Sequence, residues 1–447
     1  MTGRSSLPSS DRHGGGGSGD AVCPVTAGGG PDGPRTKGAG AAGAAQPAGG
    51  RPAHREPGRA RARGTGHARA RRRDRRVYLR AHPLLFALLA ATRGRPVRRI
   101  GRTVLVHEAD ACREVLTRLP LDRTAPGTTG GAARSALGAR KAKGTLNTGN
   151  TGDAGVLFDQ DGDAHRALRR TLARDLGTAG VDELRALWRP LIAHRLEPLA
   201  AGGTVDVVAL ARELAGTVVR ALLGSAAAPQ AVAAAAAEVA ALSVRGELPG
   251  LPRPGARAAV ARATARLRHL LGDGDNRGDE ALSAMVAVAA VNTTVAALPR
   301  AAAWCADAGL WEQAADDTLR RSLAGELLRV TAASPLLPRV AAADGVAGGC
   351  PVRSGDRLLL VARHAVGAHA SGPDALRPAP PGVARLVFGA GPHTCPGAGL
   401  AGALLEDLLA ALAPYRPAVV RARADRRAAL PGWRTLTLRA TAGRGQR

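Results

Sequence analysis

The sequence predicts a mainly α-helical protein with small peripheral β-sheets, folded as one large domain. Hydrophobic residues make up 45% of the 447 residues and charged residues 22%, which is enough apolar material for a packed core. Helical periodicity dominates from Asp163 onward, whereas strand-like runs are short and lie near both ends of the chain. Only 2% of the residues are aromatic, so we expect Ala, Val and Leu to fill the core.

The first 76 residues differ in composition from the rest. A glycine run at 14–17, an Ala/Gly stretch at 39–50 and an arginine-rich tract at 59–76 contain little apolar surface to bury. We therefore expect residues 1–76 to be a disordered N-terminal extension and residues 77–447 to form the domain. A tail of this charge could contact nucleic acid or anionic lipid. We favour a solvated extension without a partner.

The folded sequence is expected to begin with a short helix, a strand and a second helix. Residues 82–93 are rich in Leu, residues 97–106 alternate apolar and polar side chains, and residues 109–119 again have helical periodicity. Residues 124–152 are rich in Gly, Thr and Ala, and this composition predicts a long loop. Loops of that length within a domain are usually functional or mobile.

The remaining elements are predominantly helical. The predicted helices span residues 163–176, 181–199, 205–223, 229–244, 257–271, 281–298, 311–319, 324–331 and 399–412. The predicted strands lie at Val352, 357–361 and 435–439. The uncharged run at 281–298 is long enough to cross a membrane, but polar residues near its centre favour a buried helix, so no membrane span is expected.

Charge and cysteine content exclude several classes of protein. The net charge is +27, from 63 basic and 36 acidic residues, and such a charge is compatible with an anionic partner. The scarcity of aromatic side chains argues against a base-stacking surface, so no nucleic-acid partner is expected. The five cysteines show no C-x-x-C spacing, which excludes a zinc ribbon. No apolar segment follows Met1, so we expect a cytoplasmic protein.

The chemistry is indicated by one glycine-rich segment, Phe388–Gly397, which reads FGAGPHTCPG and precedes a predicted helix. The helix N-terminus and nearby backbone N–H groups are expected to lower the pKa of the Cys395 thiol. Gly389 and Gly397 let the backbone approach a flat ligand closely. A single thiolate in such a loop suits an axial ligand of iron, although a buried structural cysteine is the alternative.

This segment resembles the haem-binding loop of the cytochromes P450, whose pattern is F-x-x-G-x-x-x-C-x-G. Glu326 and Arg329 match the E-x-x-R motif of that family, in the expected order before the cysteine. The run 289–294, AAVNTT, resembles the stretch of the central helix that carries a catalytic Thr. The resemblance covers the chain from Val77 onward and is closest to bacterial members, which implies the cytochrome P450 fold.

The resemblance also implies roles for individual residues. Cys395 is the implied iron ligand, within a loop that includes Phe388, Gly389 and Gly397. The residues implied to bind the haem propionates are His165, Arg169, Arg339 and His393. Positive donors suit carboxylates, and His165 and Arg169 lie on one helix face. Thr293 and Asn292 are the implied catalytic pair for oxygen activation and proton delivery, although Thr293 could instead bond its own helix backbone.

Three departures from the family pattern bear on these roles. Asn292 stands where the family usually has an acid, and an amide has no ionisable proton. In the segment before the haem loop, Leu376 replaces a Phe and Pro380 replaces a basic residue, so the third partner of the Glu326–Arg329 pair is open, with Arg377 as candidate. The Gly-rich loop at 124–152 gives no information on the substrate. His364 and His369 are interpreted as ordinary surface residues.

Together these features predict a haem-thiolate monooxygenase that inserts one oxygen atom from O2 into a small organic substrate, in bacterial secondary metabolism. The implied cofactor is haem b, iron protoporphyrin IX, and the implied partners are a ferredoxin and its reductase. The alternatives are a P450-type catalyst of coupling, desaturation or peroxide-driven oxidation, a non-enzymatic P450-fold helper of a partner enzyme, and a nucleic-acid-binding protein that uses the arginine-rich tail. Retention of Cys395 argues against the helper.

Overall fold

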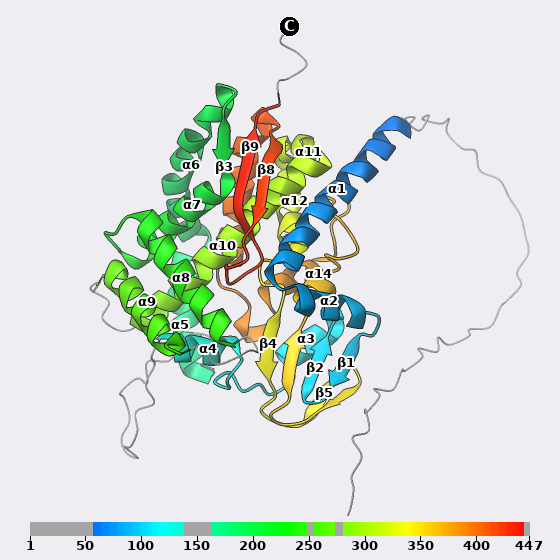
Figure 1. The fold of residues 1–447 in the computed structure, drawn as a ribbon, viewed down its shortest axis with the longest axis vertical. Helices are drawn as coiled ribbons and strands as arrows, with labels where there is room; N and C mark the ends of the chain where they lie inside the picture. Colours follow the sequence, from blue (N-terminus) through cyan, green and yellow to red (C-terminus); the bar gives the residue numbers. More distant parts are fainter. Residues whose placement is uncertain (1–56, 138–161, 248–253, 273–279, 442–447) are drawn as a thin grey trace, which may run out of the picture.

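Helices surround a central helix, and three small sheets lie at the periphery (Figure 1). The structure is a computed structural model that describes residues 57–137, 162–247, 254–272 and 280–441. The helices are α1 (Pro57–Ala81), α2 (Pro83–Thr92), α3 (Ala109–Thr117), α4 (Thr129–Leu137), α5 (Gly162–Asp175), α6 (Thr178–Ala200), α7 (Val207–Leu223), α8 (Pro229–Glu247), α9 (Ala256–Leu271), α10 (Glu280–Ala308), α11 (Trp311–Ala315), α12 (Asp317–Thr331), α13 (Ala362–Ala365), α14 (Pro381–Ala384) and α15 (Ala398–Leu412).

The sheets are small, as predicted. The strands are β1 (Val97–Ile100), β2 (Thr103–Val106), β3 (Thr204–Asp206), β4 (Leu337–Val340), β5 (Gly345–Ala347), β6 (Cys350–Val352), β7 (Arg357–Leu360), β8 (Ala418–Ala424) and β9 (Trp433–Arg439). They form one sheet of order β1-β2-β7-β4, a second of order β3-β9-β8, and a β5-β6 hairpin. The run expected as one strand at 97–106 is itself a hairpin, because Gly101 turns the chain with a φ of 57°.

Helix α10 is the central element, and it contacts α1, α7, α8 and α12. Its buried residues include Ala284, Val291, Ala297 and Trp304, which confirms the expectation of a buried helix at 281–298. The helix continues through Pro299 to Ala308, ten residues beyond that expectation. By length and composition alone, Glu280–Ala308 and Ala398–Tyr415 could each cross a membrane, but both contribute side chains to the main core.

Two predictions about the N-terminal part are wrong. The domain does not begin at Val77: residues 57–76, expected to be disordered, form most of α1, which buries Ala70 and Asp74. The remainder of the expected extension, residues 1–56, lies outside the described residues. The expected loop at 124–152 contains helix α4, and its residues 138–152 also lie outside the described residues.

A third prediction, further along the chain, is also wrong. The predicted helix at 311–319 is two helices, because Asp316 accepts hydrogen bonds from Thr318 and Leu319 and so caps α12.

Candidate active site

The cysteine loop joins two short 3-10 turns to helix α15. The first turn, Arg385–Phe388, ends at Gly389 and the second is Gly391–His393; both glycines have positive φ values, 79° and 70°. The backbone N–H of Cys395 donates to the Phe388 carbonyl over 2.8 Å and so closes the loop. A Cβ on Gly391 would lie 3.2 Å from Thr117, so the loop packs tightly against α3.

Cys395 lies directly before α15, as the sequence predicts, but its pKa moves in the other direction. Burial raises the pKa of the thiol, and this effect outweighs the Gly397 backbone N–H and the Arg169 charge, both of which lower it. The expectation of a lowered pKa is therefore wrong. By its accessible surface the residue is nevertheless exposed, so Cys395 can be reached by a ligand. Metal coordination deprotonates such a thiol outright.

Three of the four predicted propionate-binding residues gather at this loop. His165 and Arg169 come from α5, while His393 lies two residues before the cysteine. The imidazoles of His165 and His393 stack, with ring centroids 3.9 Å apart. The Arg169 guanidinium donates to the Thr394 carbonyl, next to Cys395. The helix and the loop thus place three nitrogen-rich side chains beside one thiol.

The fourth residue, Arg339, lies on β4 and is buried. Its guanidinium donates to the Pro338 carbonyl over 2.8 Å, while its Nε is buried without a hydrogen-bond partner among the described residues. Burial, assisted by the charge of Arg123, lowers the pKa of Arg339 to about 10. In the described ranges, no carboxylate lies within ion-pair distance of Arg339. A buried guanidinium without an anion favours the arrival of one.

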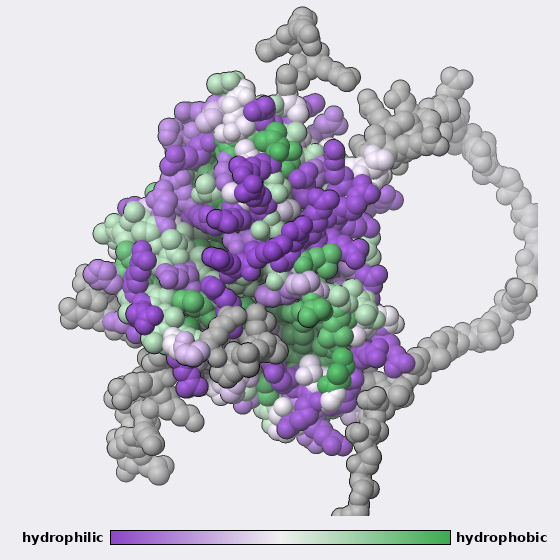
Figure 2. All heavy atoms as spheres, viewed as in Figure 1, coloured by the Kyte–Doolittle hydropathy of each residue, from purple (hydrophilic) through white to green (hydrophobic). Residues whose placement is uncertain are grey.

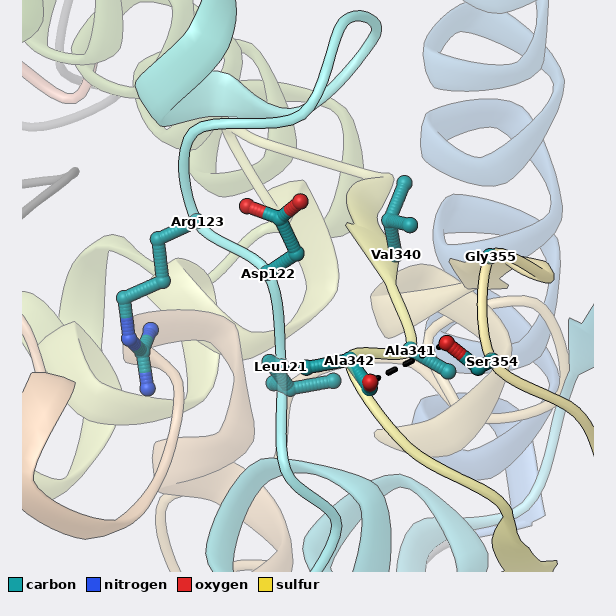
Figure 3. A pocket seen from close by; sticks show the side chains of 8 residues that line it. All are labelled: Leu121, Asp122, Arg123, Val340, Ala341, Ala342, Ser354 and Gly355. Carbon is teal, nitrogen blue, oxygen red and sulfur yellow. Dashed lines mark hydrogen bonds between the residues drawn. The ribbon is translucent and has the colours of Figure 1, made fainter.

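Arg123 is a neighbour that sequence reasoning missed. It lines a cavity of about 390 Å³ together with Leu121, Val340 and Ser354 (Figure 3). The Arg123 side chain extends away from Ser354 and Gly355, whereas the Ser354 hydroxyl donates to the Ala342 carbonyl over 3.0 Å (Figure 3). No residue of the cysteine loop lines this cavity. The proximity of Arg123 to Arg339 depends on the pairing of Leu121 with Ala341, for which the sequence contains no local signal.

The predicted catalytic pair lies in the middle of α10, and both side chains bond helix backbone. The Thr293 hydroxyl donates to the Ala289 carbonyl over 2.8 Å, which is the bonding expected of a structural Thr in a helix. The Asn292 amide donates to the Val288 carbonyl over 2.7 Å and to the Ala236 carbonyl of α8 over 3.4 Å. Asn292 therefore links two helices, and the catalytic role of both residues stays a prediction.

Glu326 and Arg329 form a buried ion pair on α12, 2.6 Å apart and each about 2% exposed. The third partner of Glu326 is the backbone: the N–H groups of Asp374 and Ala379 donate to its two oxygens over 3.2 and 3.0 Å. Arg377, the candidate from the sequence, is 86% exposed and pairs with Asp374 instead. The assignment of Arg377 is wrong because backbone N–H groups bind the Glu326 carboxylate instead. No sequence motif reveals such backbone donors.

His364 and His369 are not ordinary surface residues, because both are half-buried and pack against other imidazoles. His364 contacts His107, with 2.9 Å between their Nδ1 atoms, and its ring lies 4.8 Å from that of His369. Burial lowers the pKa of His107 to about 4 and that of His364 to about 3, and neighbouring imidazoles add to both effects. Both rings are therefore neutral at physiological pH. Within the described part of the chain, no group of three or more His, Cys, Asp or Glu could hold a metal ion.

Comparisons with known proteins give matches by structure alone. No protein-family model and no curated protein matches this chain. The structures that it resembles include the mycinamicin VIII C21 methyl hydroxylase MycCI from Micromonospora griseorubida, with a TM-score of 0.57 and 22% identity over 78% of this chain and 95% of that one. Epothilone B-bound cytochrome P450epoK has a TM-score of 0.63 and 19% identity over 80% of this chain and 96% of that one.

A third similar structure is P450BioI in complex with an acyl carrier protein ligated to hexadec-9Z-enoic acid. It has a TM-score of 0.63 and 16% identity over 81% of this chain and 99% of that one. This chain matches nearly the whole length of each of the three structures, and all three are bacterial cytochromes P450. The domain is mainly helical. It contains the cysteine loop before α15, the buried Glu326–Arg329 pair and the long central helix. This protein therefore has the cytochrome P450 fold.

Proposed function

We propose that this protein is a haem-thiolate monooxygenase, with Cys395 as the iron ligand. The observation that supports this proposal best is the accessible thiol of Cys395, held in a closed glycine-rich loop directly before α15. The fold is that of the bacterial cytochromes P450. Cys395 is the cysteine of the segment that resembles the haem-binding loop of that family. A single exposed thiol donor suits a haem rather than a four-ligand metal site.

The cationic and imidazole side chains of the predicted site fit a haem with two carboxylates. Arg339 supplies a buried guanidinium with an unpartnered Nε, and Arg169 supplies a positive charge beside Cys395. His165 and His393 lie stacked at the same loop, where imidazole N–H groups can bind a propionate. Haem b, when bound, supplies the activation of O2 that no side chain can perform. The protein contributes the thiolate, the cationic donors and control of water.

Helix α10 contacts α15, the helix that follows Cys395, and we propose that the polar residues of α10 manage the proton. Thr293 has a hydroxyl that donates to the Ala289 carbonyl, and it can instead donate toward a ligand after rotation of χ1. Asn292 is held by two carbonyls and has no ionisable proton to give. Proton delivery would therefore use the Thr293 hydroxyl together with ordered water.

The similar structures support a class of substrate, and the sequence supports a class of electron donor. MycCI and P450epoK are bound to mycinamicin VIII and epothilone B respectively, which supports an organic substrate of secondary metabolism for this chain. The sequence contains no flavin or nicotinamide fingerprint, so we propose a separate ferredoxin and ferredoxin reductase. An acidic ferredoxin would suit the strongly basic chain, because complementary charge accelerates association at low salt.

The decisive experiment measures the carbon monoxide difference spectrum of the reduced protein. A thiolate-ligated haem gives a strongly red-shifted Soret band, and Cys395→Ser should abolish this band. Cys112→Ala is the matched control, since Cys112 is a free, buried cysteine outside the loop, and this variant should retain the band. A protein that binds no haem, or a band that survives Cys395→Ser, contradicts the proposal.

A second candidate reaction is oxidation driven by H2O2, or coupling or desaturation by the same haem. The amide of Asn292, fixed between Val288 and Ala236, favours it because the usual acid of the proton relay is absent. Product analysis with O2 and reductant, compared with H2O2 alone, separates the two reactions. Turnover only with H2O2 would support the second candidate.

A further inference from the structure

Helix α1 exposes a stripe of arginines on one side. The exposed members recur at helical spacing and therefore share one face: Arg69, Arg72, Arg76 and Arg80. The residues on the opposite face are buried: Ala70, Asp74, Val77 and Tyr78. Asp74, which is buried, is the only acidic residue between Pro57 and Ile100. The stripe is therefore not neutralised by its own element.

Helix α2, which follows directly, exposes an apolar face. Its sequence, PLLFALLAAT, contains no charged residue. Leu85, Phe86 and Leu89 pack toward the sheet, whereas Leu84 and Leu88 lie on the outer face, 85% and 48% exposed. A single exposed Leu is ordinary, but two at i, i+4 spacing on a charge-free helix form an apolar patch.

The two helices are fixed to each other. The Tyr78 and Phe86 rings meet edge to face, 5.0 Å apart, and the His82 N–H donates to the Tyr78 carbonyl over 3.1 Å. Figure 2 shows hydrophilic residues along α1 and a hydrophobic area over α2 on the same face of the molecule. Arginines beside exposed leucines make a surface that is both cationic and apolar.

We propose that α1 and α2 form a peripheral docking surface for an anionic lipid membrane. Arg76 and Arg80 would lie at the headgroups, and Leu84 and Leu88 would enter the boundary with the acyl chains. Charge complementarity favours this occupant, since a neutral partner would leave the arginine stripe uncompensated. Duplex DNA would pair with the arginines through its phosphates, but two leucines beside those arginines would face the charged backbone and gain little by burial. This inference is independent of the proposed oxidative chemistry.

The test is co-flotation of the full chain with vesicles. The protein should bind vesicles of phosphatidylcholine mixed with phosphatidylglycerol, bind phosphatidylcholine alone weakly, and dissociate as salt is raised. Leu84→Ser together with Leu88→Ser should weaken binding about tenfold or more. Arg76→Gln should weaken it about fivefold. Leu187→Ser on α6 is the matched control, because Leu187 is also 48% exposed, and it should leave binding unchanged.

Several outcomes would overturn the proposal. Equal binding to neutral and anionic vesicles, or none to either, contradicts it. So does vesicle binding that persists in the Leu84→Ser, Leu88→Ser variant, because attraction between charges alone would then suffice and the leucines would have no part in docking. Tight binding to duplex DNA that displaces the vesicles and depends on Arg76 but not on the leucines would identify a nucleic-acid surface instead. Circular dichroism melting of each variant separates lost binding from lost folding.

Discussion

Asn292 shows how one side chain can have a structural role at a position that motif matching reads as catalytic. Its amide nitrogen donates to carbonyls of α10 and α8, so the residue joins two helices at the middle of the molecule. A carboxylate at the same position could accept but not donate. The departure from the family pattern is therefore consistent with the local hydrogen bonding in this chain.

Restoring the acid provides a test at this residue. Asn292→Asp would place a carboxylate against the Val288 and Ala236 carbonyls. Because a carboxylate and a carbonyl are both hydrogen-bond acceptors, we expect a loss of about 1–3 kcal/mol in the free energy of unfolding. Urea unfolding monitored by circular dichroism measures the change. Asn292→Ala, which removes both hydrogen bonds without adding charge, should cost less. An Asp variant as stable as the parent would show that the link to α8 contributes nothing.

The neutral histidine pair predicts a loss of stability in acid. The folded-state pKa values of His107 and His364, about 4 and about 3, lie below the unfolded value near 6.5, so the unfolded chain binds more protons as the pH falls. Stability should therefore decline from about pH 6.5 toward pH 4. Thermal melting across this range should show the decline, and His364→Gln should reduce its slope. His194→Gln, at an imidazole that is 69% exposed, should leave the slope unchanged.

At the scale of elements, the Glu326–Arg329 pair organises the segment that leads to the cysteine loop. Arg329 donates to the Val366 and Gly372 carbonyls over 3.0 Å each, while Glu326 accepts from two backbone N–H groups further along. One buried pair on α12 thus fixes the chain from Val366 to Ala379. The position of the cysteine loop depends on this segment, because it follows directly.

Breaking the pair should destabilise the domain strongly. Glu326→Ala leaves the Arg329 guanidinium buried without its carboxylate, and removing one partner of a buried pair costs about 3–5 kcal/mol. Urea unfolding of the purified variant measures the loss. Arg377→Ala should change stability by less than about 0.5 kcal/mol, because its side chain is exposed to solvent. A large effect of Arg377→Ala would reinstate Arg377 as the partner of Glu326.

Elements with strong periodicity were predictable from the sequence, and contacts between distant segments were not. The helices from α5 to α9 are confirmed within a few residues, since their apolar positions recur at helical spacing, and α10 is confirmed but extends ten residues further. Helix α4 was missed because glycine disfavours helices in isolation. The motif located Cys395, and helical spacing placed His165 beside Arg169. The neighbours Arg123 and Ala236 were not predictable, because sheet pairing and helix packing bring them in from distant segments.

At the scale of the whole molecule, the N-terminal helix is part of the domain. Asp74 on α1 pairs with Arg300 of α10 over 2.7 Å and with Arg363 of α13 over 3.1 Å, and all three side chains are buried. Both guanidiniums also lie over the Tyr78 ring, 4.6 and 4.0 Å from its centroid. The prediction of a disordered segment up to residue 76 is wrong. It was based on the high arginine content, which gives no sign that Asp74 pairs with buried arginines of distant segments. One carboxylate compensates two buried cations that belong to separate parts of the fold.

Asp74→Asn tests whether this anchor holds α1 to the domain. The amide keeps the volume but removes the charge, so Arg300 and Arg363 would remain buried without an anion. We expect a loss of about 3–5 kcal/mol in the free energy of unfolding and faster proteolytic cleavage within α1. Asp182→Asn is the matched control, since its pair with Arg185 is 57% exposed on the acid side, and it should change little. Equal stability of the Asp74 variant and the parent, with α1 still protected from protease, would mean that apolar packing of Val77 and Tyr78 suffices to hold the helix.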